Sequence, residues 1–151
     1  MAATAELATT QYLTFRLDNE VFALDIGKVR EVLEFTTATR VPRTPEFMRG
    51  VINLRGSVVA VVDLRLKFGM SKTKQTESTC VIISEVSVNG EALVLGALAD
   101  SVEEVIDIAA EQIVPAPRIG TRLNTEFIQG MGKQGDRFFI ILNIDNVFSS
   151  K

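Results

Sequence analysis

The chain repeats an ordered set of short motifs, and this repetition limits the possible folds more than any other feature. A V-x-E-V-aliphatic motif occurs at residues 29–33 and again 73 residues later. An E-F-x-x-G motif and a continuous apolar run that ends in Asp or Asn each recur 80 residues later. The copies lie at residues 46–50 and 126–130, and at 58–64 and 138–144. Similarities in the same order in both halves favour an internal duplication.

Each set of motifs follows a predicted β-hairpin. Residues 11–18 alternate polar and apolar side chains, which is the pattern of a strand with one buried face, and the chain then turns at Asp18-Asn19. The second hairpin turns at Asn89-Gly90, a strong signal for a two-residue turn, between strands at residues 81–88 and 92–98. The sequence therefore predicts an all-β protein.

The duplication predicts two five-stranded antiparallel barrels with a few short helical turns. A half of about 70 residues buries little surface by itself, so we expect the barrels to share a hydrophobic core. The apolar runs at residues 58–62 and 138–142 do not alternate, so we expect both faces to be buried and assign these runs to that core.

The expected boundaries are a tail at residues 1–10, a first barrel at 11–78 and a second barrel at 79–148. The pattern leaves open whether the first strand packs in its own barrel or crosses to the other. Short helical turns are expected at residues 45–50, 64–68, 109–113 and 125–130, and the prolines at 115 and 117 indicate a connector.

The residue types that are missing exclude several functions. The chain has no His and a single Cys, so it cannot build Ser-His-Asp or Cys-His catalysis or a zinc site of the usual composition. Neither G-x-G-x-x-G nor G-x-x-x-x-G-K-[ST] is present. A net charge of −3 without a Lys/Arg cluster disfavours nucleic-acid binding. We therefore predict a protein that is not an enzyme and has no cofactor or metal.

The sequence also indicates a location. Cys80 has no partner for an internal disulfide, which is typical of a reducing compartment. No apolar run approaches the roughly 20 residues of a membrane-spanning helix, and residues 1–10 lack the pattern of a secretory signal. We expect a cytoplasmic protein that does not insert into the membrane.

The motifs together resemble those of the CheW-type chemotaxis coupling proteins. Residues 47–56 read F-M-R-G-V-I-N-L-R-G and residues 61–65 read V-V-D-L-R. The resemblance continues through residues 15–26, 28–32, 98–105, 111–117 and 127–130, so it covers nearly the whole chain. It implies two SH3-like five-stranded barrels around a common core, which agrees with the duplication.

The resemblance also implies a non-catalytic adaptor. Such proteins join the cytoplasmic tips of chemoreceptors to the regulatory domain of the histidine kinase CheA, in arrays at the membrane. The receptor tip is a helical hairpin and would lie in a groove between the barrels. At this groove the resemblance places Val29, Glu31, Arg55, Val102 and Val105. It assigns no individual residues to the kinase contact.

Single residues leave alternatives open at this stage. Arg55 is expected at the tip of a turn, where it is either an ordinary solvated arginine or a guanidinium fork for carboxylates; the resemblance favours the second. Glu31 and Glu104 are equivalent in the two halves, and one asymmetric partner cannot contact both alike, so Glu31 is assigned to the site and Glu104 to the surface. We also expect Gly50 and Gly56 to serve the backbone, through either a positive φ or the close approach of another segment.

Two other functions remain possible from the sequence. A scaffold of the same type could serve a non-flagellar motility or development pathway, and nothing in the sequence separates this from chemotaxis. A β-barrel of this size could also bind a small ligand or host a carboxylate-dependent enzyme.

Overall fold

The computed structural model describes residues 9–115 and 125–149. Most of the expected tail lies outside these residues, but Thr9 and Thr10 belong to the first strand and not to the tail. Of the expected proline connector, only Pro115 is described. In the described ranges no helix is long and apolar enough to cross a membrane.

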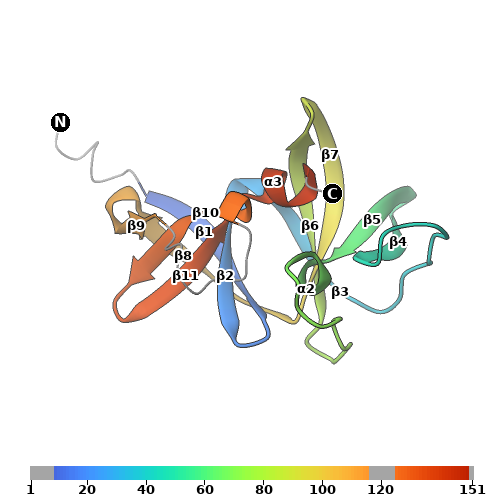
Figure 1. Ribbon diagram of the computed structural model, residues 1–151, viewed down its shortest axis with the longest axis horizontal. Coiled ribbons are helices and arrows are strands. Elements are labelled where there is room, and N and C mark those ends of the chain that lie inside the picture. Colours follow the sequence, from blue (N-terminus) through green and yellow to red (C-terminus); the bar gives the residue numbers. More distant parts are fainter. Residues whose placement is uncertain (1–8, 116–124, 150–151) are drawn as a thin grey trace.

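The strands form two curled sheets that lie side by side (Figure 1). We call the six-stranded one the terminal barrel, because its strands come from both ends of the chain, and the five-stranded one the central barrel. In spatial order, the terminal barrel holds β8 (Ser101–Ala109), β1 (Thr9–Leu17), β2 (Glu20–Asp25), β11 (Arg137–Leu142), β10 (Ile128–Gln134) and β9 (Ile113–Val114). The central barrel holds β3 (Val29–Glu34), β6 (Cys80–Val88), β7 (Glu91–Ala99), β5 (Ser57–Asp63) and β4 (Met48–Leu54).

The helical elements are short, as expected. They are η1 (Ile26–Lys28), α2 (Leu64–Lys67), η2 (Ala110–Gln112), η3 (Thr125–Phe127) and α3 (Ile144–Ser149). Three of them fall where the sequence predicted a turn. The expectation missed η1 and α3, and residues 45–50 form a turn and the start of β4 instead of a helix.

The two sheets repeat one arrangement, which supports the internal duplication. The order β8-β1-β2-β11-β10 in the terminal barrel matches β3-β6-β7-β5-β4 in the central barrel, position by position. The prediction of wholly antiparallel sheets is wrong at one joint in each barrel, because β2 pairs with β11, and β7 with β5, in parallel. These joints are not hairpins, so no tight turn forces the two strands to run in opposite directions.

Each hairpin is exchanged between the halves of the chain. The β1–β2 hairpin pairs with β8 and β11 of the second half, and the β6–β7 hairpin pairs with β3 and β5 of the first half. The barrels therefore do not divide the chain between residues 78 and 79. The chain crosses from one barrel to the other through η1 and returns at Asp100, so the first strand does lie with the second half.

The shared core lies between these two hairpins. Its fully and largely buried members come from β1, β2, β6, β7, α2, η3 and the C-terminal end: Leu13, Phe15, Leu17, Phe22, Leu24, Leu64, Phe68, Ile82, Val86, Ala97, Ala99, Phe127, Leu142, Ile144 and Val147. Phe15, Phe22, Phe68 and Phe127 form a chain of neighbouring rings with centroids 5.7–5.8 Å apart. This chain connects the terminal barrel to α2 of the central barrel.

The hairpin strands are buried on both faces, which corrects the expectation of one buried face. In β1, Leu13, Phe15 and Leu17 enter the shared core, whereas Tyr12 enters a separate cluster inside the terminal barrel. The same division holds in β6, where Ile82 faces the shared core and Ile83 the inside of the central barrel. Both faces of these strands therefore contribute to a hydrophobic core, although Glu85 and Ser87 of β6 are exposed.

The apolar runs assigned to the shared core lie mainly elsewhere. Val59 and Val61 belong to the cluster inside the central barrel, and Phe139 and Ile141 to that inside the terminal barrel. Val58 and Phe138, which occupy equivalent positions, are 75% and 55% exposed. The prediction was wrong because the outer faces of β5 and β11 are covered only near their C-terminal ends.

Two ionic contacts join the barrels. In one the helix supplies the cation, and in the other the helix supplies the anion. Asp100, at one crossing of the chain, accepts from Arg65 of α2 (2.7 Å) and from the backbone N–H of Asp18 (2.7 Å). Asp145 of α3, at the position equivalent to Arg65, pairs with Lys28 at the other crossing (3.1 Å) and accepts from the Ser87 N–H. These groups are partly exposed, so they orient the barrels more than they stabilise them.

Asp63 is the only fully buried acid among the described residues, and it fastens the segment after α2. Its side chain caps α2 as predicted, accepting from the Arg65 N–H at 3.1 Å. It also accepts from the Thr73 N–H and hydroxyl and from Arg49 Nη1 (3.3 Å). In the second half the equivalent positions carry the neutral pair Gln129 and Asn143 in place of Arg49 and Asp63.

Asp63→Asn is expected to lower the free energy of unfolding by about 2–3 kcal/mol, because its amide NH₂ would face the Arg49 and Thr73 donors. The double variant Arg49→Gln/Asp63→Asn copies the neutral pair of the second half. Its loss of stability should be about 1 kcal/mol smaller than the sum of the losses in the two single variants. Urea unfolding of the three variants measures these losses. Strictly additive losses would contradict the interaction between Arg49 and Asp63.

Candidate binding surface at the junction of the barrels

Arg55 lies at the tip of the turn between β4 and β5, as the sequence predicted. Arg55 has φ +49° and Gly56 has φ +91°, the pair of positive values typical of a tight hairpin turn. The Asn53 side chain holds the turn by accepting from the Gly56 N–H at 2.8 Å. At Gly50, φ is +145°, and a Cβ there would collide with the Thr39 carbonyl. The expected backbone role is confirmed at both glycines, with a positive φ at each and a close approach of the chain at Gly50.

Arg55 forms a two-pronged ion pair with Glu31. Nη1 donates to Oε1 at 3.3 Å, and Nη2 contacts Oε2. Glu31 lies on β3 and Arg55 follows β4, which are the two edges of the central sheet, so the pair joins these edges. The Arg55 side chain is nevertheless 69% exposed. The guanidinium is thus oriented by Glu31 and still open to a second acceptor.

The ion pair also changes the acidity of Glu31. The hydrogen bonds from Arg55 hold the pKa of Glu31 below its ordinary value, and the positive charges of Arg55 and Arg30 act in the same direction. Partial desolvation opposes them. Glu31 is therefore ionised throughout the neutral range.

The terminal barrel has a related but different arrangement. Glu104, the equivalent of Glu31, is exposed and lies 3.5 Å from Arg137, as expected of a surface charge. Arg137 also approaches Glu103, which pairs with Arg16. The position equivalent to Arg55 is Gly135. Only the central barrel therefore presents an arginine at the tip of this turn.

The expected valines surround the shared core. Val29 on β3 and Val102 on β8 are partly buried and pack directly against it. Val105 is 47% exposed and pairs with Leu13, a member of the shared core, so its side chain lies on the same face of the sheet.

Val32 belongs with these residues, although the resemblance did not place it at the groove. It is the equivalent of Val105, is 39% exposed and pairs with Ile82 of the shared core. The offset of 73 residues between the two copies was the signal that could have found it. We name Val29, Val32, Val102 and Val105 the valine rim.

The five predicted residues thus come from both barrels. Val29, Glu31 and Arg55 belong to the central barrel, and Val102 and Val105 to the terminal barrel. Glu31 pairs with Ile83, which faces the inside of the barrel, so the ion pair and Val32 lie on opposite sides of β3. The described geometry brings Arg55 and Glu31 into contact and places the valines beside one shared core.

Comparisons with known proteins identify the family. The model of the CheW-like domain matches residues 11–151. The chain belongs to the CheW-like family. It is 38% identical to the chemotaxis protein CheW of Klebsiella aerogenes over 97% of this chain and 86% of that protein. It is 34% identical to the CheW of Helicobacter pylori, over 91% of this chain and 80% of that protein.

A solved structure gives the same result. The crystal structure of the scaffolding protein TtCheW from Thermoanaerobacter tengcongensis superposes with a TM-score of 0.82 at 34% identity, and the match covers 94% of each chain. The predicted fold, two SH3-like barrels on a shared core, is confirmed. The protein is a non-catalytic adaptor of bacterial chemotaxis, also as predicted.

Arg55→Ala should raise the pKa of Glu31 towards its ordinary value, because it removes the hydrogen bonds that lower it. The stabilising contribution of the pair is present above the ordinary pKa and is lost as the pH falls through the lowered one. An NMR titration of the Glu31 carboxyl carbon in the parent and in Arg55→Ala measures the two pKa values. Arg30→Ala is the control, with a smaller effect; an unchanged Glu31 pKa in Arg55→Ala would exclude the ion pair in solution.

Proposed function

We propose that this adaptor joins the cytoplasmic tips of chemoreceptors to the regulatory domain of the histidine kinase CheA. The observation that carries the proposal is the valine rim, in which both barrels contribute exposed or half-buried apolar side chains at one shared core. A helical hairpin with an apolar stripe on one face is the kind of partner that covers such a surface. The protein would then be a cytoplasmic one that is recruited to receptor arrays at the membrane.

Arg55 supplies the polar part of the proposed receptor contact. Glu31 already orients its guanidinium, so little side-chain freedom is lost when a receptor carboxylate binds. The exposed N–H groups of Arg55 can donate to that carboxylate beside Glu31 or in exchange for it. Glu31 thus acts as a positioning residue and Arg55 as the direct contact. The kinase contact is assigned to the barrels without individual residues.

Arg55→Ala is expected to weaken binding of a receptor cytoplasmic fragment about ten-fold, which corresponds to about 1.4 kcal/mol. Binding of the CheA regulatory domain should not change. Arg137→Ala is the matched control, because it removes the arginine that pairs with the equivalent glutamate of the other barrel. Isothermal titration calorimetry of both partners measures the two affinities, and equal receptor affinity in parent and Arg55→Ala would refute the role of Arg55.

A second variant tests the apolar part of the surface. Val105→Glu places a charge beside the shared core and should reduce receptor affinity by more than about ten-fold, because the docked helix would bury that charge. Val58→Glu makes the same change at a more exposed valine that lies outside the rim, and receptor binding should stay within about two-fold of the parent. Equal losses in the two variants would assign the effect to net charge and not to the valine rim.

A further inference from the structure

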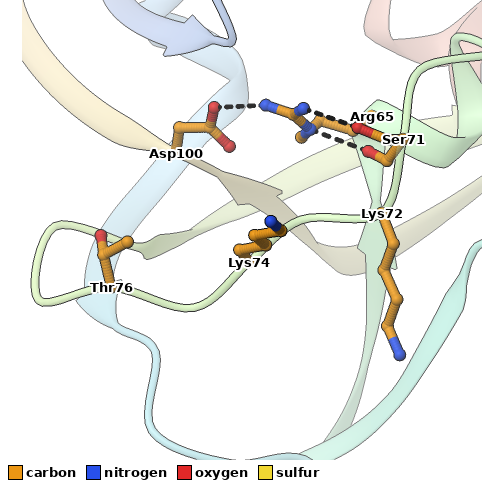
Figure 2. Close-up of a pocket in the computed structure, with 6 residues that line it drawn as sticks. All are labelled: Arg65, Ser71, Lys72, Lys74, Thr76 and Asp100. Atoms are coloured by element: carbon orange, nitrogen blue, oxygen red, sulfur yellow. Dashed lines mark hydrogen bonds and ion pairs between the residues drawn. The ribbon is translucent and has the colours of Figure 1, made fainter.

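A basic hollow lies beside the returning crossing of the chain, apart from the valine rim and Arg55. It has a volume of about 340 Å³ and is lined by Arg65, Ser71, Lys72, Lys74, Thr76 and Asp100 (Figure 2). Three of these six residues are cationic and one is acidic. The hollow therefore carries a local excess of positive charge on a chain whose net charge is −3.

The backbone that carries the two lysines is held in place. Thr73, between them in the sequence, is buried and donates to Asp63 from both its N–H (3.1 Å) and its hydroxyl (2.7 Å). Arg49 donates to the Thr73 carbonyl at 3.2 Å. Since Thr73 points inward, Lys72 and Lys74 extend outward from a fixed segment. Binding at this segment requires little ordering of the chain.

The cationic side chains of the hollow can still donate hydrogen bonds to a ligand. Arg65 donates to the Ser71 carbonyl (2.8 Å), the Ser71 hydroxyl (3.0 Å) and Asp100 (2.7 Å), as the dashed lines in Figure 2 show. These bonds occupy three of its five N–H groups, and one remains on each terminal nitrogen. In the described part of the chain, no acidic side chain pairs with Lys72 or Lys74.

We propose that this hollow binds a short carboxylate-bearing segment of a partner protein. Asp100 lines the hollow and repels a phosphate dianion more strongly than a single carboxylate. A membrane surface is normally recognised by clusters of about four to eight cations, more than the hollow offers. The site includes none of the residues assigned to the proposed receptor contact.

The neighbouring surface limits the length of the acidic segment. Thr76 also lines a second hollow, which contains Glu34 and Glu77. A longer run of acidic residues would be repelled there. The partner segment therefore carries only a short run of carboxylates, and the residues that follow them towards Glu34 and Glu77 are neutral or basic.

An NMR titration of the full-length ¹⁵N-labelled protein with acetyl-Glu-Glu-Glu-amide tests the site. At about 50 mM salt we expect saturable amide shifts at residues 71–76, with none from acetyl-Gln-Gln-Gln-amide. Lys72→Gln/Lys74→Gln should weaken peptide binding about ten-fold or more. Lys133→Gln, which removes an exposed lysine on β10 of the other barrel, should change it by less than about two-fold.

Each other outcome overturns the proposal. Absence of saturable shifts in the parent, or an equal loss in Lys133→Gln, would leave only unspecific charge attraction. Tighter binding of inorganic phosphate at the same amides would indicate a phosphate site. Binding to vesicles with 30% phosphatidylserine that depends on Lys72 and Lys74, without peptide shifts, would indicate a membrane contact. As a folding control, the spectra of the variants without peptide should match that of the parent.

Discussion

The exchanged hairpins are the constraint on which the rest of the structure depends. Each strand of the β1–β2 and β6–β7 hairpins buries one face inside a barrel and the other in the core between the barrels. Neither half of the chain can therefore complete a barrel by itself, and the two barrels hold each other in a defined orientation. Because Val29 and Val102 of the valine rim pack against this same core, the surface that we propose for a helical partner depends on both barrels at once.

Much of the fold could be predicted from the sequence. Both hairpins, the turn at Arg55, the cap at Asp63 and the duplication itself follow from local patterns that carry a physical reason. The exchange could not be predicted, because repeat offsets state which segments are alike and not which copies pair. The runs at residues 58–62 and 138–142 indicated doubly buried strands, but Val58 and Phe138 are exposed because the outer faces of β5 and β11 are covered only near their C-terminal ends.

The candidate site could be predicted in part. The resemblance supplied Val29, Glu31, Arg55, Val102 and Val105, and the geometry adds that Glu31 and Arg55 are partners. Val32 could have been found from its equivalence to Val105. The basic hollow could not, since Asp100 is 35 residues from Arg65 in the sequence and meets it only where the chain returns to the terminal barrel. Contacts that depend on the crossing of the chain have no local signature.

The most direct test of the adaptor function is whether one molecule holds both partners at the same time. Sedimentation velocity of this protein with a receptor cytoplasmic fragment and the CheA regulatory domain, alone and together, gives the answer. We expect a ternary complex that sediments faster than either binary complex. Displacement of one partner by the other, with only binary complexes at saturation, would contradict the account, because the two partners would then share one surface.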